Sequence, residues 1–416
     1  MNTRLLLLRT CTASLLVAGT CIGGGMLALP LASAPGGFVP SVTYMALVWL
    51  AMTATGLCLV EIGLWMKKED VHLVTMASTI LGKPGKWLVW LLFAFISYAS
   101  LAAYTGGCAN LIAKGITALF SISISKGASA TLFVLLATPF LLGPRRFLGR
   151  ANDIVFIAMI IAYFVIVSQG FDLIETENIF RADWQKAPMA IPLLLTAFSC
   201  HLMIPSLKSF LDNHAKALRA AVIFGMTIAF LVYALWQLVI FGSVPLEGHN
   251  GLSQALILDE PATYCLEQLT HSSIIPKAAS LFALFALITS FFGIGMGLFD
   301  FLADGLHIPR KGKGALLLAA LVLLPSLFFA AYFERIFITA LDITGGFGDT
   351  LISGMIPILM LIIGSKTIAP KKIRWSFFHY ILLFVLFTAF VSAFLYETKI
   401  RFISGESVEI HQVEQQ

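Results

Sequence analysis

Long apolar stretches separated by short polar connections make up most of this chain. We identify eleven of them, at 5–31, 38–66, 87–118, 130–143, 151–170, 188–207, 218–242, 276–300, 314–333, 349–365 and 376–396. Most reach the roughly 18 residues that a helix needs to cross a bilayer, and they carry almost no charge. The pattern predicts an all-α polytopic membrane protein with eleven transmembrane helices.

Composition agrees with this class and narrows the function. Of the 416 residues, 59% are hydrophobic and 12% are charged, and the mean hydropathy is +0.92. A transmembrane β-barrel would show short alternating segments instead. The connections are too short for a catalytic domain, and no Gly-x-x-x-x-Gly-Lys-Ser/Thr motif for a nucleotide occurs. We therefore expect neither an enzyme nor a cofactor.

The distribution of Lys and Arg predicts the orientation. Basic residues stay on the cytoplasmic side of a membrane, and most of the 27 Lys and Arg fall on one side if the N-terminus is cytoplasmic. The net charge of +5 then reflects topology rather than a nucleic-acid partner. A tail at 397–416 would lie outside. Arg4 and Arg9 before an apolar run also resemble a signal peptide, but apolar sequence continues to Leu31, so we expect a retained first span.

The first span contains a glycine-rich interruption. Residues 18–30 read AGTCIGGGMLALP, and each glycine costs a helix about 1 kcal/mol relative to alanine. In hydrocarbon, unwound backbone is tolerated only where protein or a water-filled cavity satisfies it. A half-helix that begins there directs its free N–H groups at a ligand and favours a carboxylate. The interruption predicts a binding site.

The sixth span is interrupted as well. It has Pro192 and Pro205 near its ends and His201 between them. By itself this pattern also fits a kinked helix whose carbonyls are capped by Ser199, Thr196 or water. However, broken segments five spans apart that enter from opposite faces are typical of an inverted repeat. We expect a five-plus-five arrangement with discontinuous helices 1 and 6: a first repeat at 1–170, a second at 188–365, and an extra helix at 376–396.

These residues carry a family resemblance. Gly19 to Pro30 resembles the first-helix signature of the amino acid–polyamine–organocation superfamily. His201 with Pro205, the stretch from Thr289 to Asp300, and Gly345 to Asp349 resemble more narrowly the hydroxy/aromatic amino acid permeases, the bacterial tyrosine and tryptophan permeases. Ser199 and Cys200 stand where related permeases often have glycine. The resemblance implies a secondary transporter of the bacterial inner membrane that imports tyrosine, tryptophan or phenylalanine by proton symport and alternating access.

An amino acid presents a carboxylate, an ammonium group and a side chain, and each needs its own partner. Gly23, Gly24 and Gly25 suit the carboxylate, because backbone without a Cβ allows close approach. For the ammonium group we expect unpaired carbonyls, those of Cys21, Leu195, Ala197 and Phe198. Thr20 and Ser199 either add hydroxyl contacts or bond helix to helix. Candidates for an aromatic pocket are Phe198, Tyr98, Tyr104, Phe285 and Phe292, which otherwise pack in the core or face lipid.

Ionisable side chains inside spans are candidates for ion coupling. Those in or near the spans are Glu61, Asp153, His201, Asp300 and Asp349. Glu61 and Asp300 either take part in ion coupling or lie close enough to a span end to reach the membrane–water interface. His201 lies mid-span, and an imidazole titrates near working pH, so it either carries a proton or is a neutral group bonded between helices.

Sodium is the alternative coupling ion. Hydroxyls of Thr289 and Ser290, with carbonyls of Ala18 and Cys21, offer the hard oxygen ligands that it prefers; otherwise the two hydroxyls bond back to their own helix. The resemblance favours protons, whereas a sodium-coupled or broader neutral amino acid permease stays open. The six cysteines show no metal-ligand spacing.

Overall fold

The computed structural model describes residues 3–66, 72–143, 145–269, 274–333, 335–370 and 376–404. Within these ranges the chain is helical and has no strand. This confirms the predicted all-α membrane protein.

Ten elements form the first part of the chain. They are α1 (Thr3–Cys21), α2 (Gly24–Ser33), α3 (Phe38–Trp65), α4 (Leu73–Phe120), α5 (Lys126–Leu142), α6 (Arg145–Gly170), η1 (Phe171–Leu173), α7 (Thr176–Phe180), η2 (Ala187–Ala190) and α8 (Ile191–Ala197).

Eleven elements follow. They are α9 (Ile204–Phe210), α10 (Ala215–Ser243), α11 (Leu252–Ile257), α12 (Thr263–Leu269), α13 (Ile274–Leu306), α14 (Lys313–Tyr332), α15 (Ile336–Ile343), the π-helical η3 (Thr344–Met355), α16 (Ile356–Thr367), α17 (Phe377–Thr398) and the π-helical η4 (Lys399–Ser404).

Among the described residues, nine helices are long and apolar enough to cross a membrane. Three shorter apolar helices, Gly24–Ser33, Lys126–Leu142 and Ala187–Ala197, coincide with the second half of the first predicted span and with the fourth and sixth. Each predicted span thus has a helical counterpart. A total of eleven crossings stays a prediction.

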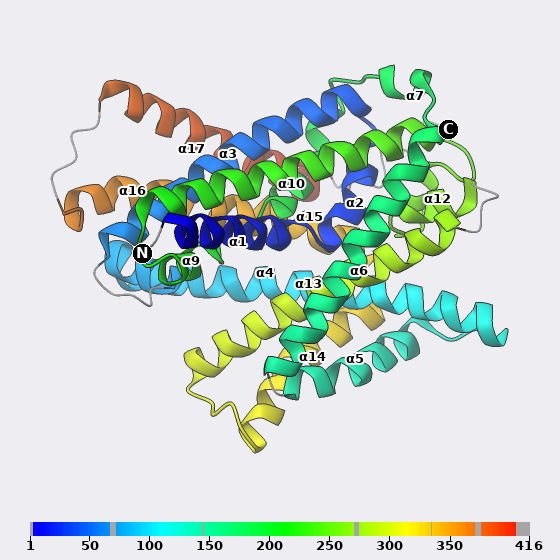
Figure 1. The fold of residues 1–416 in the computed structure, drawn as a ribbon, viewed down its shortest axis with the longest axis horizontal. Coiled ribbons are helices and arrows are strands. Elements are labelled where there is room, and N and C mark those ends of the chain that lie inside the picture. Colours follow the sequence, from blue (N-terminus) through cyan, green and yellow to red (C-terminus); the bar gives the residue numbers. More distant parts are fainter. Residues whose placement is uncertain are drawn as a thin grey trace.

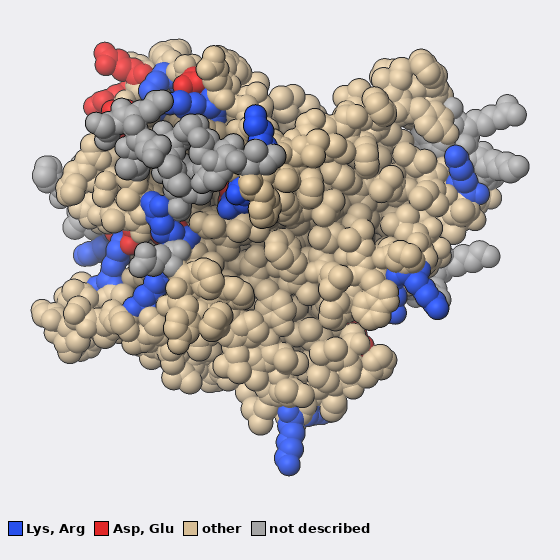
Figure 2. All heavy atoms as spheres, turned by 180° about the vertical axis from the view of Figure 1, so that it is seen from behind, with Lys and Arg blue, Asp and Glu red and all other residues tan. Residues whose placement is uncertain are grey.

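Most of the long helices run between two ends of the bundle (Figure 1). The chain begins at one end, which we call the α1 end, and α7 and α12 lie at the other, which we call the α7 end. Charged side chains lie mainly toward these two ends, with a broad uncharged surface between them (Figure 2). Large apolar side chains such as Leu135 of α5, Phe224 of α10 and Phe384 of α17 are exposed, as expected where lipid replaces water.

Three predicted boundaries were wrong. The tenth span was predicted to begin at 349, but its helix begins at Ile336, because the glycine- and threonine-rich stretch that reads as a loop forms a continuous π-helical segment. The third begins at Leu73 rather than 87, and a kink at Gly82, with φ of 72°, joins its two parts. The tail predicted from 397 is helical through Ser404, since η4 continues α17.

Some topology predictions fall outside the described residues. These include cytoplasmic positions for Lys67, Lys68, Lys371, Lys372 and Arg374, and the remainder of the predicted external tail, 405–416. Membrane orientation and the division into repeats at 1–170 and 188–365 stay predictions.

Candidate functional site

The first span is broken where its sequence changes to glycine. α1 ends at Cys21 and α2 begins at Gly24, with Gly23 between them in an extended conformation at φ −167° and ψ −150°. The predicted discontinuity is therefore confirmed. The first N–H groups of α2 have no partners within their own helix, and one of them, on Gly24, donates to Ser290 Oγ of α13 at 2.9 Å.

Close neighbours explain two of the three glycines. A Cβ added at Gly23 would overlap Ser290 Oγ, and one added at Gly24 would overlap the ring of Tyr104 on α4. A Cβ at Gly25 would meet only Ala197 Cα, at 3.8 Å. The structure thus brings together four residues singled out in the sequence: Gly23, Gly24, Tyr104 and Ser290.

The sixth span is also broken, between α8 and α9. Residues 198–203 form turns: Ser199 N–H donates to Thr196 O at 3.1 Å, and Cys200 N–H donates to Phe198 O at 3.1 Å. Pro205 stands in the first turn of α9, where the missing donor costs nothing. The span is discontinuous as predicted, rather than simply kinked.

A single tyrosine joins the two breaks. The hydroxyl of Tyr233, on α10, lies 2.5 Å from Cys21 O at the end of α1 and 2.9 Å from Ala197 O at the end of α8. Its ring packs edge-on against Phe198 with centroids 5.3 Å apart, and the residue is fully buried. Sequence analysis missed Tyr233, since a tyrosine in an apolar span carries no local signal.

Trp236, one turn further along α10, contacts the other half of the first span. Its indole N–H donates to Met26 O of α2 at 3.1 Å, and its ring lies 5.3 Å from that of Phe282 on α13. Trp236 is also fully buried. Aromatic side chains of α10 and α13 therefore pack beside the start of α2.

The carbonyls predicted to receive an ammonium group differ in their present partners. Those of Cys21 and Ala197 accept from Tyr233, and that of Phe198 accepts from the Cys200 N–H. A carbonyl oxygen has two lone pairs, so a further donor can still bind each of them. Leu195, the fourth, is a buried residue of α8.

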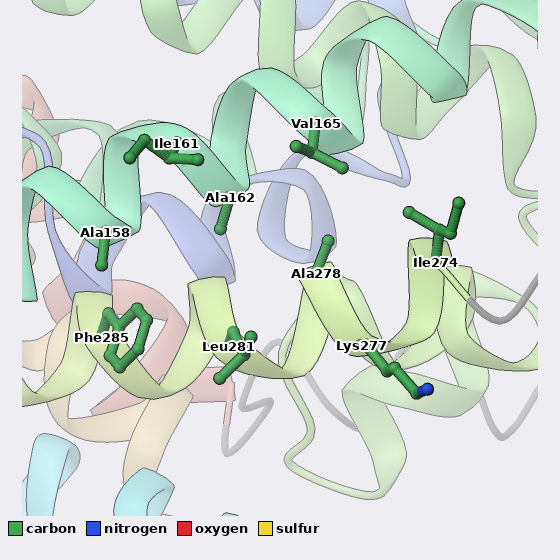
Figure 3. A pocket seen from close by; sticks show the side chains of 9 residues that line it. All are labelled: Ala158, Ile161, Ala162, Val165, Ile274, Lys277, Ala278, Leu281 and Phe285. Carbon is green, nitrogen blue, oxygen red and sulfur yellow. The ribbon is translucent and has the colours of Figure 1, made fainter.

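Three predicted substrate residues lie apart from this cluster or are engaged elsewhere. Tyr98 donates its hydroxyl to Leu321 O of α14 at 2.9 Å. The Thr20 hydroxyl is exposed and bonds to Leu16 O at 2.8 Å and to Met203 Sδ at 2.7 Å. Phe285 lines a mostly apolar groove of about 460 Å³ between α6 and α13, with Lys277 toward its other end (Figure 3).

The predicted coupling residues are placed as follows. His201 is fully buried, with Nε2 at 2.9 Å from Thr55 Oγ1 of α3 and no partner for Nδ1. Glu61 of α3 pairs with Arg219 of α10 at 2.6 Å. The Thr289 hydroxyl bonds back to Phe285 O at 2.9 Å and Ala286 O at 3.1 Å, which is the alternative to a sodium ligand. Ala18 O accepts from the Ile22 N–H at 2.8 Å.

An acidic side chain reaches the second break from η3. Ser199 donates its hydroxyl to Asp349 Oδ1, and Ser353 donates to the same oxygen at 3.1 Å. Asp349 is fully buried, and its Oδ2 has no hydrogen-bond partner. The sequence placed Asp349 at the start of the tenth predicted span, and its position beside Ser199 became visible only in the folded chain.

Comparison with known proteins agrees with this architecture. A crystal structure of MhsT in complex with L-phenylalanine superposes with a TM-score of 0.65 over 92% of this chain and 97% of that one, at 15% sequence identity. Similarity at this level shows a shared fold.

Sequence relatives and a family model give the family. Tyrosine-specific transport system 1 of Haemophilus influenzae is 33% identical over 81% of this chain and 84% of its own length. Tyrosine-specific transport system 2 of the same organism is 29% identical, with coverages of 81% and 84%. The model of the tryptophan/tyrosine permease family matches residues 9–395. This chain is a multi-pass membrane protein that belongs to the tryptophan/tyrosine permease family.

Proposed function

We propose that this protein imports aromatic amino acids, with tyrosine as the preferred substrate, across a bacterial inner membrane. We further propose that a proton gradient drives this import. Its role is transport rather than catalysis, with the N-terminus cytoplasmic. The substrate would bind between the two broken helices. The observation that carries the proposal is the meeting of two half-helix ends at one tyrosine hydroxyl, that of Tyr233.

The start of α2 supports binding of the carboxylate. A helix N-terminus inside a low-dielectric protein favours negative charge. The Gly24 N–H already donates to Ser290 Oγ, and Gly25 has no side chain that would block the next N–H group. We expect the carboxylate to bind at Gly24 and Gly25 and to displace or share the Ser290 hydroxyl.

The ends of α1 and α8 support binding of the ammonium group. The last carbonyls of a helix carry partial negative charge, and the carbonyls of Cys21 and Ala197 are oriented toward a common point by Tyr233. Phe198 packs on the ring of Tyr233, while Tyr104 and Trp236 contact the start of α2 at Gly24 and Met26. Aromatic rings pack favourably edge-to-face with one another, which suits an aromatic side chain, and two relatives are named tyrosine-specific.

Transport into proteoliposomes tests the proposal. The full chain is reconstituted, and uptake of labelled tyrosine, tryptophan and phenylalanine is measured with an imposed pH gradient or sodium gradient. We expect saturable tyrosine uptake that requires the vesicle interior to be more alkaline and that a protonophore abolishes. Uptake that follows the sodium gradient and ignores pH would favour the sodium-coupled alternative, and a lack of saturable uptake of all three would refute aromatic transport.

A further inference from the structure

Asp349 differs from the other buried acids of the described residues. Those others are Asp259, Glu260, Asp342 and Glu397. Asp259 accepts two backbone N–H bonds, Glu260 pairs with Lys114, and Asp342 and Glu397 both pair with Arg401. Asp349 has only the hydroxyls of Ser199 and Ser353, both on one oxygen, and no described Lys, Arg or His forms an ion pair with it.

A buried carboxylate without a cation is costly. Desolvation of an ionised group is compensated only by an opposite charge or by several hydrogen bonds. Two hydroxyl donors satisfy Oδ1 of Asp349, whereas Oδ2 lies in the interior with no donor. A proton on Oδ2 removes the charge and so removes most of this cost.

Among the described residues, no neighbouring cation neutralises Asp349 in place of that proton. Tyr104 on α4 and Cys21 at the end of α1 are close enough to interact with it electrostatically, but both are weak acids rather than cations. The break after α8 contributes the Ser199 hydroxyl, and no described residue of α16 is paired with Asp349. Glu397 of α17 packs on Gly346, three residues before Asp349, and the charge of Glu397 is matched by Arg401.

Position links this acid to the broken helix. Ser199 belongs to the 198–203 break, five residues before α9 begins at Ile204. Its hydroxyl donates to Asp349, so the charge of Asp349 acts directly on the break. His201, by contrast, points to Thr55 of α3 on another side of the same break.

We propose that Asp349 is the group that binds and releases the transported proton. In the state open to the outside, Oδ2 takes a proton from a hydronium ion, and the O–H bond formed leaves a neutral acid that can be enclosed without water. In the state open to the inside, water reaches Oδ2, takes the proton, and leaves a hydrated carboxylate. This inference rests on the proposed function, because it assumes that protons drive transport.

Two transport assays separate coupling from binding. Accumulation of tyrosine is measured with a pH gradient of one unit, which supports about tenfold accumulation for one proton per substrate, and tyrosine exchange is measured with equal pH on both sides. For Asp349→Asn, a permanently neutral analogue, we expect accumulation to fall to about onefold while exchange persists. Asp172→Asn removes an exposed acid of η1 that the site does not use and is the matched control, which we expect to accumulate tyrosine as the parent does.

The outcomes distinguish the two proposals. If the parent chain shows no accumulation with the pH gradient, proton symport fails, and this inference fails with it. If the parent accumulates tyrosine and Asp349→Asn does so equally, proton symport stands and Asp349 is not its carrier. Loss of accumulation in His201→Gln with retention in Asp349→Asn would assign the role to His201 instead.

A spectroscopic readout covers the case in which Asp349→Asn loses all transport. Infrared difference spectra of the reconstituted chain between acidic and alkaline pH report the carbonyl stretch of a protonated carboxylic acid. We expect a band that disappears in Asp349→Asn and returns, shifted, in Asp349→Glu. An identical band in the parent and Asp349→Asn would overturn the proposal.

Discussion

Tyr233 illustrates how single residues define this site. One hydroxyl group cannot donate its hydrogen fully to two carbonyls, so Cys21 O and Ala197 O share it. The consequence is that the ends of α1 and α8 are held together by a side chain from a third helix. Gly23 and Gly24, by contrast, contribute by having no side chain. Because they lack a Cβ, Ser290 and Tyr104 can pack directly against their backbone.

Tyr233→Phe removes the shared hydrogen bond and leaves the ring. A net hydrogen bond contributes about 1 kcal/mol, so we expect the free energy of unfolding to fall by about 1–2 kcal/mol and tyrosine binding to weaken about tenfold. Thermal unfolding and equilibrium binding measure these changes. The control is Tyr163→Phe, whose hydroxyl bonds to Val232 O at 3.0 Å between α6 and α10. Equal loss of binding in both variants would argue against a special role for Tyr233.

Gly24→Ala places a methyl group against the ring of Tyr104. Overpacking of this kind costs about 1–3 kcal/mol, and it falls at Gly24, where we propose that the substrate carboxylate binds. We expect tyrosine affinity to fall at least tenfold while the protein still inserts, as measured by binding to the purified chain. Gly297→Ala on α13, where an added Cβ meets nothing within 4 Å, should bind normally; similar affinities for the two variants would contradict the assignment.

At the scale of elements, sequence predicted the breaks better than the boundaries. Three consecutive glycines in span 1 and two prolines in span 6 oppose helix formation locally. The interruptions in these spans could therefore be predicted from the sequence. The tenth span was read too short, because Thr344 to Gly348 has loop-like composition yet is buried by α4, α8 and α17. The role of Tyr233 and the contact between Ser199 and Asp349 depend on tertiary packing. No local sequence pattern predicts either of them.

The start of α15 is capped by an acid from the connection between α11 and α12. Asp259 accepts from the N–H groups of Phe337 and Ile338, each at 3.0 Å. Burial raises the pKa of Asp259 from 3.8 to about 6, against the effect of those hydrogen bonds. The folded chain therefore holds the proton more tightly than the unfolded chain does between these two pH values.

This difference predicts a pH-dependent stability. A raised pKa means that the contribution of Asp259 is fully present below about pH 4 and is lost as pH rises through about 6, a change of up to about 3 kcal/mol. Asp259→Asn, neutral throughout, should flatten the parent's decline in thermal stability over this range. Asp172→Asn removes an exposed acid near the same end and serves as control. A parent and an Asp259→Asn variant with parallel pH profiles would rule out this contribution.

At the scale of the whole molecule, contacts close the bundle at both ends. At the α7 end, the Ala262 N–H donates to Leu27 O of α2 at 3.1 Å, and Lys114 of α4 pairs with Glu260 at 2.7 Å. At the α1 end, Arg9 pairs with Asp212 and Arg219 pairs with Glu61. Alternating access requires that each set open in turn.

Glu260→Gln weakens closure at the α7 end. The Glu260 side chain is 10% exposed and that of Lys114 is 41% exposed, so solvent screens this pair mainly from the lysine side. We expect the α7 end to open more often and a membrane-impermeant maleimide to label the buried Cys265 of α12 several-fold faster. In a variant with Cys265 as its single cysteine, the rate is compared with and without Glu260→Gln, and Glu177→Gln on exposed α7 is the control. An unchanged rate would show that this pair does not limit opening.

A structure of the protein with bound L-tyrosine would show directly where the substrate binds. We expect ligand density between the two breaks, with the carboxylate about 3 Å from the N–H groups of Gly24 and Gly25 and the ammonium group near Cys21 O and Ala197 O. One competing cavity among the described residues is the groove between α6 and α13, with Phe285 at one end and Lys277 toward the other (Figure 3). Tyrosine bound in that groove, with the space between the breaks unchanged, would contradict the account.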